Sequence, residues 1–190
     1  MKVIKGLFFD LDGTLLNTEE SQFRAYQKAL KVHGRRLTHV DHQRVFGNDS
    51  GTFLPMLFPD ITDDEVRDIR RLKAGFYEEF MHLVRPNVQL IDFFRTVRPH
   101  HITALVTTGK RANILPLLEA HLLTHLFDHV ILGEDVENFK PHPEAYQKAL
   151  KLSGLQADEV LAFEDSDTGV ESAQAAGINV IKITIPKTKS

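Results

Sequence analysis

Helical and strand-like patterns alternate along the second half of the chain, and this alternation constrains the fold more than any other feature. After Asn87 the pattern predicts helices at 88–97, 111–121, 143–152 and 168–176, and strands at 102–106, 130–132, 160–163 and 179–183. Such alternation is typical of an α/β domain, because each helix carries the chain back over the sheet before the next parallel strand. We therefore predict an α/β fold with a Rossmann-like parallel-sheet core.

The first strand of this core is separated from the others by a helical insertion. Residues 3–9 predict a strand buried on both faces. Residues 41–84 have a helical pattern that is broken at 47–51 and at Pro59, and Thr62–Glu65 match a capping box that opens a long helix. We expect an α/β core and an inserted α-helical cap domain, with these bounds: 1–16 and 87–190 for the core, and 17–86 for the cap.

Polar residues follow four of the predicted strands. They are Asp10-Leu11-Asp12-Gly13-Thr14, Thr107-Thr108-Gly109, Lys140 with Pro141, and Glu164-Asp165-Ser166. In an open parallel sheet, ligands bind beyond the carboxyl ends of the strands. Carboxylates, a hydroxyl, an ammonium and glycine-rich backbone should therefore meet at one edge of the sheet.

This set of groups suits a divalent cation together with a phosphate. Several carboxylates make the hard oxygen site that Mg²⁺ prefers. Thr107, the amides around Gly109 and the N-terminus of the following helix suit phosphate oxygens, and Lys140 adds positive charge. A carboxylate held beside Mg²⁺ can attack phosphorus and form an aspartyl-phosphate. Asp10 and Asp12 can then lie two residues apart, because the cation and the ammonium offset their repulsion.

Four segments resemble the successive motifs of the haloacid dehalogenase-like (HAD) hydrolase superfamily. They are DLDGT, LVTTGK, FKPHPEAY and FEDSDTGVESAQAAG, and in this order they span nearly the whole chain. The match is closest to the branch of phosphatases and β-phosphoglucomutases with a small helical cap. The resemblance implies a Mg²⁺-dependent phosphoric monoester hydrolase whose substrate is a small phosphorylated metabolite, such as a sugar phosphate.

The resemblance also implies roles for the acidic residues. Asp10 is expected to be the nucleophile and to ligate Mg²⁺. Asp12 is expected to be the general acid/base and to offer its backbone carbonyl to the metal. Asp165 is expected to be a further metal ligand, while Glu164 ligates Mg²⁺ directly or acts through water. The superfamily's dehalogenases need no metal, so Asp12 and the acidic pair favour phosphatase chemistry.

The phosphate-binding residues follow from the second and third motifs. By resemblance, Thr107 and Lys140 hold the phosphoryl group, and Thr108 and Gly109 contribute to the same loop.

Several positions differ from the pattern of the phosphomutases. Those enzymes have a cap histidine soon after the first motif and a basic cap loop for a second phosphate. Here Gln22 takes the histidine position, and Phe46 and Ser50 stand where basic residues are expected. Hydrolysis is therefore favoured, and a β-phosphoglucomutase-type phosphomutase is the alternative. Asn17 replaces a usual aspartate, a change expected to affect the hinge more than the chemistry.

A third hypothesis is a phospho-acceptor signalling module. Receiver domains also combine aspartates, Mg²⁺, a threonine and a lysine on a parallel sheet. However, they are shorter, have no cap, and carry their acid pair before a separate acceptor aspartate. An acid/base two residues from the acceptor, as Asp12 is from Asp10, would speed loss of the phosphoryl group.

Composition excludes several other classes. The net charge of −3 provides no broad cationic surface, so we expect no nucleic-acid partner. The chain has no cysteine, which rules out thiolate catalysis and disulfides. No run of about 18 apolar residues and no signal peptide are recognised, so we expect a cytoplasmic monomer without a membrane segment. His121, His125 and His129 are spaced four apart, but 124–128 predicts a loop, so they should not form a metal site.

Overall fold

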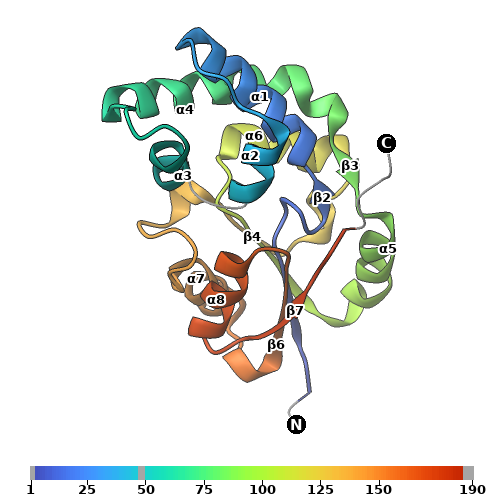
Figure 1. Ribbon diagram of the computed structural model, residues 1–190. Helices are drawn as coiled ribbons and strands as arrows, with labels where there is room; N and C mark the ends of the chain where they lie inside the picture. Colours follow the sequence, from blue (N-terminus) through green and yellow to red (C-terminus); the bar gives the residue numbers. More distant parts are fainter. Residues whose placement is uncertain (1–2, 47–49, 186–190) are drawn as a thin grey trace. The chain divides into compact units, whose positions relative to one another are not determined.

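The computed structural model describes residues 3–46 and 50–185, and it divides into two compact units. The core unit comprises Met1–Asn17 with Pro86–Ser190, and the helical unit comprises Thr18–Arg85 (Figure 1). The predicted break at 47–51 lies partly outside the described residues. Within the described ranges, no helix is both long enough and apolar enough to cross a membrane.

The core unit contains a five-stranded sheet with strand β1 at its centre. The strands, in the order β5-β4-β1-β6-β7, are His129–Ile131, Ile102–Val106, Gly6–Phe9, Val160–Glu164 and Asn179–Lys182. Every pair of neighbouring strands is parallel. The predicted parallel α/β sheet with flanking helices is therefore confirmed. Two further strands of two residues each, β2 (Leu16–Asn17) and β3 (Arg85–Pro86), pair with each other.

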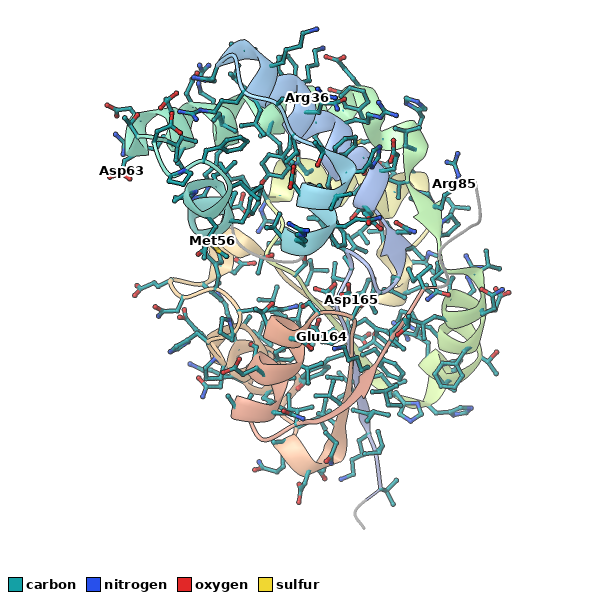
Figure 2. The ribbon with its side chains drawn as sticks, in the orientation of Figure 1. Arg36, Met56, Asp63, Arg85, Glu164 and Asp165 are labelled. Carbon is teal, nitrogen blue, oxygen red and sulfur yellow. The ribbon has the colours of Figure 1, made fainter. Side chains whose placement is uncertain are left out.

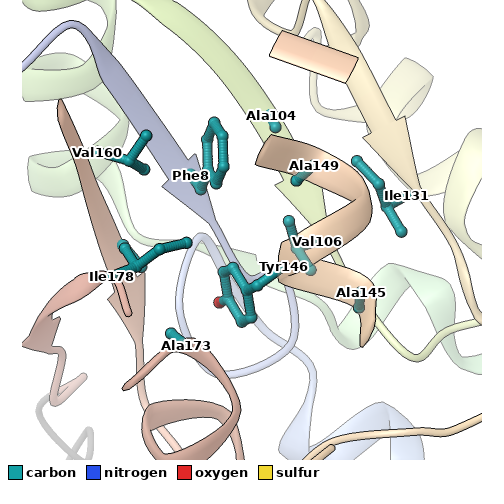
Figure 3. Packing of buried hydrophobic residues seen from close by; sticks show 11 residues of the cluster. Phe8, Ala104, Val106, Ile131, Ala145, Tyr146, Ala149, Val160, Ala173 and Ile178 are labelled. Carbon is teal, nitrogen blue, oxygen red and sulfur yellow. The ribbon is translucent and has the colours of Figure 1, made fainter. Parts of the chain in front are cut away.

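Helices cover both faces of the sheet. They are α5 (Val88–Val97), α6 (Arg111–Ala120), α7 (Glu144–Ser153) and α8 (Asp167–Ala175), with the short 3₁₀ turns η2 (Arg98–His100), η3 (Thr124–Leu126), η4 (Gly133–Asp135) and η5 (Ala157–Glu159) between elements. Phe8 and Phe9 are consecutive in β1 and so point to opposite faces. Phe8 packs in a cluster with residues of α7 and α8 (Figure 3), whereas Phe9 stacks on Phe94 of α5 at 4.2 Å between ring centroids. Helices α7 and α8 therefore cover one face, and α5 covers the other.

The strand register brings three strand ends together. Phe9 of β1 is opposite Leu105 of β4 on one side and Phe163 of β6 on the other. The next residues along these strands are Asp10, Val106 and Glu164, and all three strands run the same way. Asp10, Val106 and Glu164 therefore lie beside one another at the carboxyl edge of the sheet.

Side-chain caps fix where two helices of this edge begin. Asn87 precedes α5, and its side-chain oxygen accepts a hydrogen bond from the Leu90 amide at 3.3 Å. Ser166 precedes α8, and its hydroxyl accepts from the Gly169 amide at 3.0 Å. Such caps satisfy amides that the first turn of a helix leaves unpaired. Only Asp165 and Ser166 separate the end of β6 from the start of α8, which places Asp165 in a tight turn.

The helical unit has its own apolar core. Its elements are α1 (Glu19–Val32), α2 (His39–Val45), α3 (Ser50–Leu57), α4 (Asp63–Tyr77) and the 3₁₀ helix η1 (Glu78–Leu83). The predicted capping box is confirmed: the Glu65 amide donates to Thr62 Oγ1 at 3.2 Å, and the Thr62 amide donates to Glu65 Oε2 at 3.0 Å. Helices α1 and α4 pack against each other. The buried side chains of this core are Phe23, Ala29, Leu30, Leu37, Val45, Phe53, Leu54, Val66 and Ile69.

Candidate active site

A buried lysine joins two carboxylates at the carboxyl edge of the sheet. The Lys140 ammonium nitrogen lies 2.7 Å from Asp10 Oδ1 and 2.5 Å from Glu164 Oε1. It also donates to the Val106 carbonyl at 2.8 Å. The Lys140 side chain is 6% exposed and that of Glu164 is 0% exposed. These charges therefore interact with little screening by water.

A third carboxylate completes an acidic cluster. Asp10, Glu164 and Asp165 each present an oxygen within 4.8 Å of the other two. Glu164 and Asp165 are consecutive at the end of β6 (Figure 2). The Thr14 hydroxyl donates to Asp165 Oδ1 at 3.3 Å. Gly13 has a φ of +88°, and a β-carbon there would lie 2.0 Å from Asp165 Oδ2. The glycine of the first motif therefore lets its loop lie directly against Asp165.

The electrostatics of the cluster show an excess of negative charge. Burial raises the pKa of Asp10 well above its ordinary value; Lys140 lowers it again, but Glu164, Asp165 and Asp12 add to the rise. Burial, followed by repulsion from Glu164, raises the pKa of Asp165 to about 6. Burial disfavours the charged form of Lys140, but the attraction of Asp10 and Glu164 outweighs this and raises its pKa. One ammonium does not neutralise this many carboxylates.

The donor set fits a hard divalent cation. Glu164 Oε2 is buried and has no hydrogen-bond partner among the described residues. A buried polar atom without a partner costs free energy, and a nearby cation would remove that cost. The ligands on offer are carboxylate oxygens, which suit Mg²⁺ better than softer metals. Among the described residues this is the one cluster of three or more potential ligands, and it contains no histidine.

Asp12 is close to the cluster without being part of it. Its charge acts on the pKa values of both Asp10 and Asp165. Its backbone forms an isolated bridge with Leu16. The Leu16 amide donates to the Leu11 carbonyl at 2.9 Å, so residues 11–16 form a tight turn directly after Asp10.

The second motif forms a compact loop after β4. Thr107 is buried, and its hydroxyl oxygen accepts a hydrogen bond from the Gly109 amide at 3.1 Å. The hydroxyl proton is therefore free to donate to another group. Thr108 is exposed, and Gly109 is half-buried. A β-carbon at Gly109 would meet Ile114 Cδ1 at 2.4 Å, so the loop lies close to the side chain of Ile114 in α6. Thr107 follows Val106, whose carbonyl binds Lys140, so the loop lies next to the ion cluster.

The helix after this loop has its first amide already paired. The sequence predicts that this N-terminus suits phosphate oxygens. In the structure, the Arg111 amide at the start of α6 donates to both carboxylate oxygens of Glu134, at 3.1 and 3.0 Å. An anionic side chain of the protein thus occupies this position. The remaining amides of the loop and Thr107 are left as the candidate phosphate donors.

Tyr146 and the Val106 carbonyl belong to the site but were not predicted from the sequence. The Tyr146 hydroxyl donates to Glu164 Oε1 at 2.5 Å, and the side chain is completely buried. Burial, followed by the charge of Glu164, raises the pKa of Tyr146 well above its ordinary value, so it remains a donor. Tyr146 does stand inside the third motif, FKPHPEAY, and this position was the available signal.

The three histidines spaced four apart are separated by the fold. His121 follows α6, His125 lies in η3, and His129 begins β5. This agrees with the prediction that they do not share one helix.

Comparison with known proteins gives a match over nearly the whole chain. The model of the family described as haloacid dehalogenase-like hydrolase matches residues 7–183. The phosphorylated carbohydrates phosphatase of Thermotoga maritima is 32% identical over 184 residues, which covers 94% of this chain and 84% of that protein. The fructose-1-phosphate phosphatase of Escherichia coli is 28% identical over 184 residues, with coverage of 95% and 96%.

A solved structure shares the fold. The crystal structure of CbbY from Rhodobacter sphaeroides in complex with phosphate superposes with a TM-score of 0.84. The alignment covers 98% of this chain and 89% of CbbY at 24% sequence identity.

Proposed function

This chain belongs to the haloacid dehalogenase-like hydrolase family, and from that membership we propose that it is a Mg²⁺-dependent phosphatase of a small, sugar-like phosphate monoester. The observation that carries the proposal is the buried contact of Lys140 with Asp10 and Glu164, next to Asp165. It combines a potential nucleophile, a cation and further acidic ligands in one place. A simple structural ion pair would not need the additional, unneutralised carboxylates.

Asp10 is proposed to act as the nucleophile. A carboxylate oxygen of Asp10 attacks the phosphorus of the monoester, the bond to the leaving oxygen breaks, and an aspartyl-phosphate forms. Lys140 lies against Asp10 and offsets negative charge that moves onto the phosphoryl oxygens. The Thr107 hydroxyl proton is available to donate to one of those oxygens.

Asp12 is proposed to move the proton in both half-reactions. As an acid it protonates the leaving alkoxide, so that the substrate departs as an alcohol. As a base it then takes a proton from water, which attacks the aspartyl-phosphate and releases inorganic phosphate. This restores the carboxylate of Asp10 and the acid form of Asp12.

Asp10, Asp165 and the backbone of Asp12 are the proposed Mg²⁺ ligands, with Glu164 as a direct or water-mediated fourth. When bound, Mg²⁺ would offset the negative charge of the acidic residues and of the phosphate. The raised pKa values of Asp10 and Asp165, both caused first by burial, support a need for such a cation.

The helical unit is proposed to be the cap that selects the substrate. The relatives named above act on phosphorylated carbohydrates and fructose 1-phosphate, which supports a sugar-like substrate. The test is a panel of phosphorylated sugars, phosphorylated acids and nucleotides, assayed for release of inorganic phosphate with Mg²⁺. Asp10→Asn is the control. Equal phosphate release by the wild type and Asp10→Asn on every compound would contradict the proposal.

A further inference from the structure

The Lys140 ammonium has no spare hydrogen to offer a substrate. A lysine ammonium carries three N–H groups. In the structure they have three acceptors: Asp10 Oδ1, the Val106 carbonyl and Glu164 Oε1, at 2.7, 2.8 and 2.5 Å. The Lys140 ammonium can therefore contact a phosphoryl oxygen only if one of these three hydrogen bonds breaks. The bond to Asp10 is the one that weakens once Asp10 carries the phosphoryl group and loses its charge.

The other two bonds must then hold the ammonium in place. The Val106 carbonyl belongs to β4 and is fixed by the sheet. Glu164, in contrast, is a side chain, and its carboxylate can rotate unless something fixes it. The position of Lys140 during the reaction thus depends on what restrains Glu164.

Tyr146 provides this restraint. Its hydroxyl donates to the same oxygen, Glu164 Oε1, that accepts from Lys140. Its ring is buried with Phe8, Ala173 and Ile178 (Figure 3), so the hydroxyl cannot move away easily. The Lys140 nitrogen also lies 5.4 Å from the centre of the Tyr146 ring, within range of a cation–π contact.

Helix α8 lies close to the other oxygen of the carboxylate. A β-carbon at Gly169 would lie 2.0 Å from Glu164 Oε2, so α8 packs directly against this oxygen. Two donors hold one oxygen of Glu164, and the glycine face of α8 borders the other. The carboxylate therefore has one orientation that satisfies Lys140.

We propose that Tyr146 is a positioning residue of this active site, which acts through Glu164 to keep the Lys140 ammonium directed at Asp10. The proposal rests on the proposed function for its catalytic consequence, but the restraint of Lys140 can be tested without any substrate. The tyrosine would not touch the substrate itself.

The first experiment measures the ammonium directly. A buried, hydrogen-bonded lysine ammonium exchanges its protons slowly with water, and its ¹⁵Nζ–¹H signal can be observed by NMR. The Lys140 signal is assigned by its loss in Lys140→Met. Tyr146→Phe keeps the ring and removes only the hydroxyl. We expect it to speed proton exchange of the Lys140 ammonium at least about 10-fold, because Glu164 is no longer fixed. An unchanged exchange rate would overturn the proposal, whether or not the protein is a phosphatase.

The chain offers a matched control. The heptapeptide AYQKALK occurs at 25–31 and at 145–151. Tyr26 of the first copy packs with Phe53 in the helical unit, at 5.2 Å between ring centroids. Tyr26→Phe removes the same hydroxyl from the same local sequence and should leave the Lys140 exchange rate unchanged. An equal effect of both variants would contradict a specific role for Tyr146.

The second experiment tests the link through Glu164. Using the best substrate from the panel, Tyr146→Phe should lower kcat roughly 10- to 100-fold, the range expected for one hydrogen bond to a charged group, with a much smaller change in KM. In a Glu164→Gln background, Tyr146→Phe should cause little further loss, because the carboxylate through which it acts is gone. If Tyr146→Phe instead lowers kcat by the same factor in the wild-type and in the Glu164→Gln background, Tyr146 acts by another route and the proposal is overturned.

Discussion

Gly169 and Glu164 are packed so closely that a single added carbon would not fit between them. A β-carbon at 169 would lie 2.0 Å from Glu164 Oε2 and 2.2 Å from Glu164 Cδ. Alanine usually stabilises a helix relative to glycine by roughly 0.5–1 kcal/mol. Here the added methyl group would instead push a buried carboxylate away from Lys140.

Gly169→Ala is therefore expected to lose most of its phosphatase activity without gaining stability. We expect kcat to fall at least about 10-fold, because the hydrogen bond from Lys140 to Glu164 is disturbed. The measurements are kcat and the urea midpoint of unfolding. Gly75→Ala in α4 is the control, since a β-carbon there meets nothing within 4 Å. Gly75→Ala should raise the free energy of unfolding by roughly 0.5–1 kcal/mol and leave kcat unchanged. A fully active Gly169→Ala would show that Glu164 tolerates displacement.

Asp10 and Asp12 should have separable effects. Asp10→Asn removes the attacking oxygen and should abolish phosphoryl transfer. Asp12→Asn keeps the nucleophile but removes the proton carrier, a role worth about 10²–10⁴ in rate. It should slow breakdown of the aspartyl-phosphate, which rapid acid quench with labelled substrate would detect. Label on any residue other than Asp10 would contradict the assignment.

Activity should depend on Mg²⁺. A chelator should abolish phosphate release and added Mg²⁺ should restore it, because the carboxylates of the site repel one another without a cation. Asp165→Asn should raise the Mg²⁺ concentration needed for half-maximal activity, since a neutral amide binds the ion less well. Calorimetric titration of Mg²⁺ into both proteins provides a measurement that does not depend on turnover. Full activity in chelator would exclude a metal-dependent mechanism.

The enzyme should release phosphate rather than transfer it within one substrate. A mutase must hold a bisphosphate intermediate by a second cationic site. At the cap positions where the phosphomutases carry a histidine and basic residues, this chain has Gln22, Phe46 and Ser50. Arg24 is paired with Glu20 at 2.7 Å. We therefore expect inorganic phosphate from β-glucose 1-phosphate and no stimulation by catalytic amounts of glucose 1,6-bisphosphate. Steady formation of glucose 6-phosphate with little free phosphate would establish the mutase alternative.

The helical unit should lose stability in mild acid because of His42. Burial, followed by the neighbouring charges of His39 and Lys73, lowers the pKa of His42 from 6.5 to about 4. Between pH 6.5 and 4 the unfolded chain binds a proton that the folded chain does not bind, so stability falls as the pH falls through this range. The loss should be on the order of 2–3 kcal/mol.

His42→Phe should remove this pH dependence. The ring of His42 lies among Phe23, Tyr26 and Phe46, and its Nδ1 has no hydrogen-bond partner in the described residues, so an aromatic replacement suits the site. The measurement is urea unfolding at pH 7 and pH 4.5. Replacement of the exposed His82 by phenylalanine is the control and should keep the wild-type dependence. An equal loss of stability in acid for His42→Phe would assign the effect to other groups.

The pattern of apolar residues and caps was sufficient to predict most elements of the core. The helix Val88–Val97 and the strand Ile102–Val106 have the predicted bounds, because Asn87 and the apolar run mark their limits. Strand β1 begins at Gly6 rather than at residue 3, since its partner strands β4 and β6 begin opposite Gly6. Strand β6 includes Glu164, whose backbone pairs with Lys182 of β7. Such limits depend on neighbouring strands and cannot be obtained from local sequence.

The candidate site was partly predictable from the order of the helices and strands. Parallel strands place their carboxyl ends at one edge, so the meeting of Asp10, Lys140 and Glu164 could be expected from the order of the elements. The contacts of Tyr146 could not be expected from the order of the elements. Tyr146 and Tyr26 stand in identical heptapeptides, yet one hydroxyl binds a buried carboxylate of the core unit, and the other residue packs among aromatic rings of the helical unit. Their surroundings come from distant parts of the chain.

The central position of β1 has a consequence for synthesis of the protein. Residues 6–9 are synthesised before their partner strands, which are not complete until residues 106 and 164 have been made. The apolar core of the helical unit draws on residues between 23 and 69 and can form much earlier. The nascent chain therefore carries an apolar strand with two open edges at a stage when the helical unit can already fold. During this interval β1 is the expected binding site for chaperones and the expected starting point of aggregation.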